Sequence, residues 1–491
     1  MARAFYEPLS AESAAYLDAE RSRRRQHVAM IAVFDGGPLA TAAGGVDFER
    51  IRRIVALRVS ERPRLRMKLR RVPLDGHPVW IDDPEFHLDY HLQQSSLPRP
   101  GSHAQLCRTT ARIAATRLDR SRPLWDCWVL EGLEGGRFAL VLKMHKALAN
   151  LEGADLLQAL LSPSPERVEG HPRPAMPRPA PSPIELFSEE VVRGLGPSRR
   201  ALGEGLRTLR RPRRALGHAR KQAHAVLHWM GYRMRPTGES PFDGDLGPHR
   251  SFAIRAVDLE VVQRMRRAHG GSVHDGVLTL LAGALRRFVA DRRIHPVSVD
   301  LRAVTPILVA DGTRARSFTV ELPIWEDDPA QRHAIVREQT RRIRVEEDVA
   351  MGDTITDGRE WNATRLFAIG ARALRRIDTG HIGVLQSPGP QQPLYMDGAE
   401  LRECYGIFPL QDHSGLGVTV LGQAGRLFFA FNADTNRVPD FERLAEALDD
   451  EVEAIVRATS SARPTLRAVG GRSGSSWRGR PVASPRRPQP D

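Results

Sequence analysis

The most informative hydrophobic pattern in the chain runs over residues 138–161. An apolar run, Phe138–Leu142, follows two glycines and predicts a buried β-strand. A short polar stretch comes next, and leucines on one helical face then predict an amphipathic helix over 156–161. His145 and Lys146 are therefore expected where a buried strand runs into a helix, a position suited to chemistry.

The same periodicities predict mixed α/β structure on both sides of this stretch. Gly270 and Gly271 predict the C-terminal cap of one helix and Ser272 the N-cap of the next, so that His274 and Asp275 fall in a first helical turn. Apolar runs predict strands at 28–34, 79–81, 86–92, 128–130, 252–257, 297–304, 317–322, 417–421 and 427–433. Helical spacing predicts helices at 48–59, 104–118, 259–269, 272–289, 329–345 and 440–456.

Composition divides the chain into four segments. Residues 1–161 and 251–457 have the mixed pattern of two α/β domains. Residues 162–250 begin Pro-rich, which predicts a semi-rigid linker, and continue as a basic stretch with amphipathic helical spacing. Residues 458–491 are rich in Arg, Ser, Gly and Pro and predict a disordered tail.

The 491-residue chain has a net charge of +14, and this positive charge is concentrated in two segments. Residues 193–235 hold twelve Lys or Arg and one Glu, and residues 457–491 hold eight Arg and one Asp, so the rest of the chain is slightly acidic. The two basic segments fit either solvated, flexible regions or docking surfaces for an anionic membrane or nucleic acid. They lack the interleaved aromatic residues of base-stacking surfaces, so no nucleic-acid partner is expected.

Other compositional features favour a cytoplasmic protein. Apolar residues make up 41% and charged residues 27%, as in soluble globular proteins. No apolar run reaches the roughly 18 residues of a membrane span, and the N-terminus lacks the apolar core of a secretory signal. The three cysteines, Cys107, Cys127 and Cys404, have no metal-ligand spacing and fit a reducing compartment.

Common catalytic motifs are missing from the sequence. It has no P-loop, no Gly-x-Gly-x-x-Gly after a strand and no Gly-x-Ser-x-Gly elbow. His87 and His91 are four residues apart, but in the strand predicted there this spacing only places them on one face. No metal site is predicted.

A set of distinctive motifs runs through both predicted domains. They are Glu7–Ser10, Pro78–Pro84, Phe86–His91, Leu118–Gly132 with its Pro-Leu-Trp, the stretch 138–161, Ser272–Leu285, Ser387–Leu394 and Gly415–Asp434. Together these motifs resemble the bacterial wax ester synthase/acyl-CoA:diacylglycerol acyltransferase family, and the likeness covers roughly residues 5–457. The resemblance implies an α/β fold of two similar CoA-dependent acyltransferase domains, like chloramphenicol acetyltransferase, with the active site in a channel between them.

The family's signature is His-His-x-x-x-Asp-Gly, and its second His is the general base that deprotonates the acceptor hydroxyl. A base needs a pKa near the working pH, which His has. In this chain His145 aligns with the first His, Lys146 with the base and Asn150 with the Asp, and the Gly is either replaced by Leu151 or lost. The base, the carboxylate and the glycine are therefore all changed.

These changes leave several possibilities for the site. Lys146 could act as the base if burial lowered its pKa by several units. His145 could replace it, the base could lie elsewhere, or ordinary transferase activity could be lost. The family's Asn-Asp pair appears as His274-Asp275, where the His is either a first-turn residue or a relocated base facing the channel. The family's Asn-Val-Pro-Gly-Pro appears as Leu385–Pro390 without the Asn.

The resemblance implies transfer of an acyl group from acyl-CoA, as co-substrate, to a diacylglycerol or long-chain alcohol in triacylglycerol or wax ester synthesis. No further cofactor is expected. The alternative is a catalytically inactive homologue that binds acyl-CoA or lipid, or that partners an active paralogue. The basic amphipathic segment adds an expectation of peripheral contact with an anionic membrane, on its inner face, or with lipid droplets.

Overall fold

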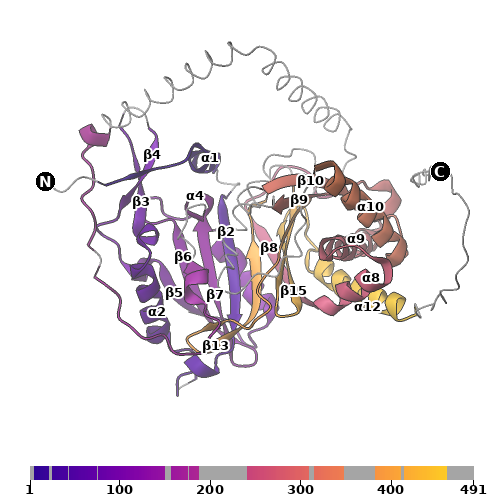
Figure 1. The fold of residues 1–491 in the computed structure, drawn as a ribbon, viewed down its shortest axis with the longest axis horizontal. Coiled ribbons are helices and arrows are strands. Elements are labelled where there is room, and N and C mark those ends of the chain that lie inside the picture. The colour runs from indigo at the N-terminus through magenta and orange to yellow at the C-terminus, as the bar shows by residue number, and fades with distance from the viewer. Residues whose placement is uncertain are drawn as a thin grey trace, which may run out of the picture.

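In the computed structural model the chain forms two α/β halves that lie side by side, each built on a six-stranded sheet (Figure 1). All structural statements concern the described residues, 5–20, 25–42, 44–73, 76–149, 156–174, 176–186, 240–308, 315–347, 382–410 and 414–461.

The N-terminal sheet has the strand order β12-β13-β2-β7-β6-β5. Only β5 and β6 run parallel to each other. Every residue of β2 is buried, because this central strand is covered on both faces. The strands are β2 (His27–Phe34), β5 (Leu92–Ser96), β6 (Trp125–Leu133), β7 (Arg137–His145), β12 (Tyr395–Met396) and β13 (Ala399–Ile407).

Helices and a small second sheet complete the N-terminal half. Helix α3 packs against β6, β7 and β8, and α1 packs against α4 at the end of β7. The helices are α1 (Ala11–Ala19), α2 (Phe48–Ser60), α3 (His103–Ala115), α4 (Lys146–Ala149) and α5 (Leu156–Leu160), with 3₁₀ turns η1 (Gly37–Leu39), η2 (Pro63–Arg66) and η3 (Leu88–Tyr90). The small sheet is β1 (Glu7–Pro8), β4 (Pro78–Asp82) and β3 (Met67–Arg71).

The C-terminal sheet has the order β10-β9-β11-β14-β15-β8, and the helices described for this half lie on the side away from the N-terminal half (Figure 1). The strands are β8 (Arg250–Asp258), β9 (Arg302–Leu308), β10 (Ala315–Glu321), β11 (Ile382–Ser387), β14 (Leu416–Gln423) and β15 (Arg426–Asp434). The helices are α8 (Leu259–His269), α9 (Val273–Asp291), α10 (Pro329–Glu347) and α12 (Glu442–Ser461), with the 3₁₀ turn η4 (Pro296–Ser298).

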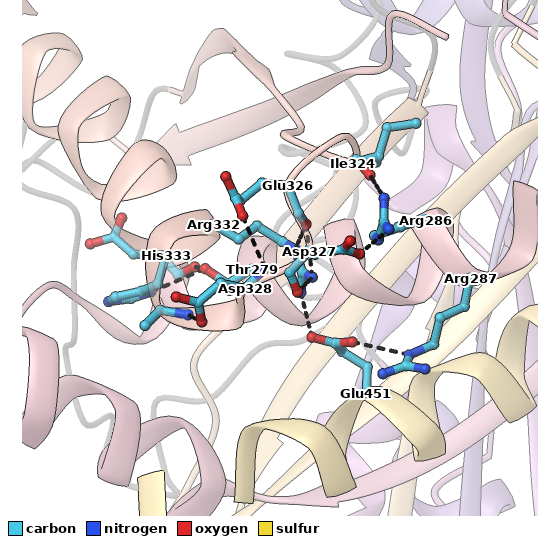
Figure 2. A network of polar contacts seen from close by, with 12 residues as sticks. Thr279, Arg286, Arg287, Ile324, Glu326, Asp327, Asp328, Arg332, His333 and Glu451 are labelled. Atoms are coloured by element: carbon cyan, nitrogen blue, oxygen red, sulfur yellow. Dashed lines mark hydrogen bonds and ion pairs between the residues drawn. The ribbon is translucent and has the colours of Figure 1, made fainter. Parts of the chain in front are cut away.

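A buried ion pair joins three of these helices. Figure 2 shows Arg332 of α10 against Glu451 of α12, and both side chains are 1% exposed. The second carboxylate oxygen of Glu451 lies 3.1 Å from Nε of Arg287 on α9. Gly283 of α9 makes room for the pair, because a Cβ there would lie 2.1 Å from the carboxyl carbon of Glu451. The helical layer therefore has a polar centre inside an apolar core.

Strand β13 links the two halves. It follows β11 in the chain yet pairs with β2 of the N-terminal sheet, with Gly406 opposite Met30. On its other side Thr419 of β14 donates to the carbonyl of Gly406, and Asn432 of β15 donates to the carbonyl of Phe408 at 2.8 Å. The domain boundaries predicted from composition stay a prediction, and the strand pairing adds that residues 395–407 complete the N-terminal sheet.

The predicted strand over 86–92 is wrong. Residues Leu88–Tyr90 form the 3₁₀ turn η3, because Tyr90 and His91 donate backbone hydrogen bonds back to His87 and Leu88. His87 is exposed, whereas His91 is buried with its ring stacked on Trp125 and its Nδ1 2.8 Å from the Trp125 carbonyl. The two histidines therefore do not share a face.

Two other strand predictions need correction. The strand expected over 297–304 starts only at Arg302, because Pro296 has no N–H and opens the 3₁₀ turn η4. The strand expected to end at Leu142 continues to His145. Lys143 can lie in this buried strand because its ammonium contacts Asp126 at 3.0 Å and donates to the carbonyls of Ile113 and Thr116.

The described part of the Pro-rich segment runs along the N-terminal half without forming a sheet. Arg178 makes a two-pronged ion pair with Asp82, at 2.6 and 2.8 Å, and the Pro179 carbonyl accepts from the backbone of Phe5 at 3.1 Å. The basic stretch 187–239 lies outside the described residues, as do residues 462–491 of the predicted tail. Residues 458–461 were expected in that tail but belong to α12. The described residues include no helix long and apolar enough to cross a membrane.

Candidate active site at the ends of β2 and β7

The antiparallel register of β2 and β7 places His27 directly opposite His145. Paired residues project from the same face of a sheet, and the two imidazole centroids are 5.8 Å apart in an edge-on arrangement. Both residues are buried, with exposed fractions of 6% and 1%. Two strands that are far apart in the chain thus form one buried histidine pair.

The backbone determines which nitrogen of His145 carries the proton. The N–H of Ala147 donates to Nδ1 of His145 at 3.0 Å, so the proton of the neutral ring is on Nε2. Burial lowers the pKa of His145 to about 3, and the nearby His27 acts in the same direction. The Nε2 atom has no hydrogen-bond partner among the described residues. His145 is therefore a neutral N–H donor whose lone pair is already occupied.

His27 has the opposite arrangement. Its Nε2 lies 3.0 Å from Oε1 of Glu20, while Nδ1 is buried without a hydrogen-bond partner in the described part of the chain. Burial alone would raise the pKa of Glu20, but His27 and Arg120 lower it well below the usual range. Arg120 contacts the other carboxylate oxygen at 2.8 Å. The ionised carboxylate favours the proton on Nε2 of His27 and leaves the lone pair on Nδ1.

Lys146, at the position of the family's base, is the first residue of α4 and is 4% exposed. Its Nζ lies 5.0 Å from the centroid of the Tyr16 ring. The face of an aromatic ring attracts an ammonium ion. Its backbone N–H donates to the carbonyl of Gln26 at 2.8 Å and holds the start of α4 beside β2. Asn150 and Leu151 lie outside the described residues.

Asp275 stabilises the start of α9. Its Oδ2 accepts from the backbone of Ser272 at 2.7 Å in a capping box, and its Oδ1 accepts from the hydroxyl of Thr340 at 2.6 Å. The predicted N-cap at Ser272 is thereby confirmed. Both carboxylate oxygens of Asp275 therefore accept hydrogen bonds, one from the N-cap of α9 and one from α10. Asp275 acts as a helix-capping residue.

His274 contacts the segment Leu385–Pro390, which aligns with the family's Asn-Val-Pro-Gly-Pro motif. Its Nδ1 lies 2.7 Å from Oε1 of Gln386, near the end of β11. An amide oxygen only accepts, so Nδ1 carries the proton and Nε2 the lone pair. The structure thus brings together two positions that are far apart in the sequence.

A basic pocket of about 850 Å³ lies between the two halves, along α3 on one side and β8 and the start of α12 on the other. Arg108 and Arg112, one turn apart on α3, line it together with Arg250 and Arg443. The acidic residues lining it are Asp440 and Glu442. Like charges at i and i+4 repel each other. Arg250 is already paired with Asp434 at 2.9 Å, so the other lining side chains leave only a small excess of positive charge, at Arg108 and Arg112 on α3.

Comparison with protein families assigns both halves of the chain to one family. Residues 9–277 match the wax ester synthase/diacylglycerol acyltransferase catalytic domain, and residues 312–456 match the C-terminal domain of the same family. The chain belongs to this family. The resemblance seen in the sequence motifs is confirmed.

This member of the wax ester synthase/diacylglycerol acyltransferase family aligns with individual relatives over most of their lengths. A protein of Mycobacterium tuberculosis H37Rv named "putative diacylglycerol O-acyltransferase" is 29% identical over 440 residues, 86% of this chain and 85% of its own. A second protein of that organism, named "probable diacylglycerol O-acyltransferase", is 28% identical over 478 residues, 94% of this chain and 98% of its own.

The fold also matches solved structures. The wax ester synthase/diacylglycerol acyltransferase from Marinobacter aquaeolei VT8 superposes with a TM-score of 0.64 at 20% identity, covering 92% of this chain and all of that one. The first condensation domain of the calcium-dependent antibiotic synthetase superposes with a TM-score of 0.50 at 15% identity, covering 93% and 97%. The predicted fold of two acyltransferase-like α/β domains is confirmed.

Sequence reasoning did not identify His27 or Glu20. The only local signal for His27 was its place at the start of a continuous apolar strand. Among the described residues no group of three or more His, Cys, Asp or Glu side chains could hold a metal ion. The histidine pair at the strand ends can transfer a proton and donate a hydrogen bond.

Proposed function

We propose that this family member transfers a fatty acyl group from acyl-CoA to the hydroxyl of a diacylglycerol or a long-chain alcohol. The observation that carries the proposal is the buried histidine pair, in which one ring offers an N–H and the other a lone pair. Ester formation needs both, because the hydroxyl loses a proton as its oxygen attacks the thioester carbonyl. The carbonyl oxygen then becomes negative and needs a donor.

His145 is suited to the second of these roles. Its Nε2–H is buried and unpaired within the described residues, and the Ala147 backbone fixes its orientation. A preorganised donor in a water-poor site stabilises an oxyanion more strongly than water does. In this proposal His145 binds the thioester oxygen, while Lys146 and Asn150 stay candidate site positions inherited from the family motif.

The basic pocket supports acyl-CoA as the donor. The CoA head carries a diphosphate and a ribose phosphate, and Arg side chains bind phosphate oxygens in two-pronged contacts. Helix α3 lines the pocket and also contacts β7, the strand that ends at His145, because the carbonyls of Ile113 and Thr116 near its C-terminal end accept from Lys143. We therefore place the CoA phosphates at Arg108 and Arg112, with the pantetheine arm leading toward His145.

A second candidate function is that of a silent homologue that binds acyl-CoA or lipid, or that partners an active paralogue. The observation that favours it is the Lys146 ammonium, which packs on Tyr16 where the family has its base. In this reading the pocket still binds acyl-CoA, but no ester is formed.

Acyl transfer by the purified protein distinguishes the two candidates. Radiolabelled palmitoyl-CoA is offered with diacylglycerol and with hexadecanol, and palmitoyl-CoA binding is measured by calorimetry. Ester product supports the transferase, whereas binding without product supports the silent homologue. If Arg108→Glu and Arg112→Glu raise the KM for palmitoyl-CoA about tenfold and Arg341→Glu does not, the pocket binds the donor. Arg341 is a suitable control because it is exposed on α10 and pairs with Glu338.

The predicted contact with an anionic membrane or a lipid droplet is kept as part of the proposal. It rests on the alternation of Arg and apolar residues in the stretch 193–235. Co-flotation of the protein with vesicles containing anionic lipid, which deletion of that stretch should abolish, tests it.

A further inference from the structure

We propose that His27 is the general base of the acyl transfer and that Glu20 is the residue that positions it. This inference rests on the proposed function. It names the group that takes the proton in place of the family's second histidine, which in this chain is Lys146.

The geometry of His27 is that of a histidine–carboxylate dyad. Glu20 lies 3.0 Å from Nε2 of His27, and Arg120 holds the other oxygen of Glu20 at 2.8 Å. The His27 contact is at ion-pair distance without hydrogen-bond alignment, and catalytic contacts often tighten only when substrate binds. A carboxylate at Nε2 leaves the lone pair on Nδ1.

Four buried polar atoms without hydrogen-bond partners in the described ranges lie at this place. They are Nδ1 and Nε2 of His27, Nε2 of His145 and Oε1 of Glu20. Buried polar atoms in native proteins are nearly always paired, so a cluster of unpaired ones indicates a place that a ligand or water satisfies. An acceptor on His27 and a donor on His145 match the two needs of a hydroxyl attacking a thioester.

The proposed reaction balances in two steps. Nδ1 of His27 removes the hydroxyl proton while the oxygen forms a bond to the thioester carbonyl carbon, and the carbonyl oxygen takes the negative charge beside Nε2–H of His145. The tetrahedral intermediate then collapses, the carbon–sulfur bond breaks, and the CoA thiolate takes the proton from His27. The products are an ester and CoA with a free thiol, and His27 returns to its neutral form.

The other candidate bases fit less well. The lone pair of His145 accepts from the Ala147 backbone, and the Lys146 ammonium packs on an aromatic ring. His274 has a base-competent tautomer, but its Nδ1 faces the neutral amide of Gln386. A carboxylate stabilises the imidazolium that forms during proton transfer more strongly than an amide does.

The charged groups around His27 determine the expected pH dependence. Burial lowers the pKa of His27, Glu20 raises it, and Lys143 and Arg25 lower it again. His145, on the neighbouring strand, is neutral because burial lowers its own pKa to about 3. His27 is therefore in its unprotonated, base-competent form near neutral pH. The rate should fall at acid pH as His27 is protonated.

The test measures steady-state transfer of palmitate to hexadecanol, together with CoA release in the absence of alcohol, for the full-length parent and its variants. His27→Gln keeps an amide near the Nε2 position but removes the lone pair of Nδ1. We expect it to lower kcat/KM by about 10²- to 10⁴-fold, the usual contribution of a general base. His91→Gln is the matched control, because His91 is equally buried in the same half of the protein.

Glu20→Gln provides a readout that a merely structural role would not change. Loss of the carboxylate removes the interaction that raises the pKa of His27, so the acid limb of the kcat/KM profile should move to lower pH. An unchanged limb overturns the positioning role of Glu20. Circular dichroism and the unfolding temperature confirm that each variant is folded before its kinetics are compared.

The outcomes separate this inference from the proposed function. A parent that esterifies neither hexadecanol nor diacylglycerol and releases no CoA refutes the transferase, and the base assignment with it. An active parent with a folded His27→Gln variant that keeps its rate within about threefold refutes the base assignment alone. So does a loss of rate confined to Lys146→Ala or His274→Gln. An active parent whose rate is lost in His27→Gln and kept in His91→Gln supports the inference.

Discussion

The buried ion pair in the helical layer makes a strong prediction about stability. Replacing Arg332 by Met removes the positive charge that faces Glu451, while both positions stay in an apolar surrounding with 1% exposure. The guanidinium also donates to the carbonyls of Glu326 and Asp327 at 3.0–3.1 Å, and these acceptors lose their donor. Among the described residues, Arg287 is the ion-pair partner that the carboxylate of Glu451 keeps (Figure 2). The side chain of Arg287 is 39% exposed.

The expected loss in free energy of unfolding is large because the substitution leaves the buried Glu451 carboxylate with an incomplete set of partners. Removing one member of a buried ion pair costs about 3–5 kcal/mol, and a domain of this size loses about 2–4 °C per kcal/mol. We therefore expect Arg332→Met to lower the unfolding temperature of the C-terminal half by about 10 °C. The long apolar side chain of Met fills much of the space, so the effect reports the lost charge more than a cavity.

Thermal and urea unfolding of the parent and three variants check this reasoning. Arg287→Met, which removes the more exposed partner of the same carboxylate, should cost less than about 1 kcal/mol. The double variant Arg332→Met/Glu451→Met should recover most of the loss, because an apolar pair can replace a buried ion pair. The explanation fails if Arg332→Met unfolds within 1 kcal/mol of the parent. It also fails if the double variant is no more stable than the single one.

Two further predictions concern pH and thiol chemistry. Burial by itself would raise the pKa of Glu403, but His103 and other partners lower it to about 2, so the stability it contributes is present above pH 4.5 and is lost as pH falls toward 2. Glu403→Gln should therefore flatten the fall in urea midpoint between pH 4.5 and 2, and a slope equal to that of the parent contradicts this. Burial raises the pKa of Cys107 and Cys127 to about 12, and Cys404 is also buried. A thiol reagent such as DTNB at pH 8 should modify none of the three in the native protein and all of them after unfolding, so rapid native labelling is the contrary result.

Local pattern was enough to predict most elements of the fold. The continuous apolar run over 28–34 predicted a strand, which the structure shows as β2 with all of its residues buried. Ser272 followed by Asp275 predicted the start of α9, and the capping box lies there. These features depend on neighbours within four residues, so the sequence order alone specifies them. The failure at 86–92 came where a distant partner decides, because Trp125 of β6 stacks on His91. The late start of β9 has a local cause instead, the 3₁₀ turn that Pro296 opens.

The sequence by itself therefore determined the family, the two-domain α/β fold and the place of His145 and Lys146 at the end of a strand. Only the tertiary structure decided what those residues can do. The register of β2 against β7 brings His27 to His145, and the turn after β7 occupies the lone pair of His145. Glu20 reaches His27 through the fold rather than through sequence spacing. Periodicity encodes which residues are buried, but the proton position and charge of a buried side chain depend on partners that only chain folding brings into contact.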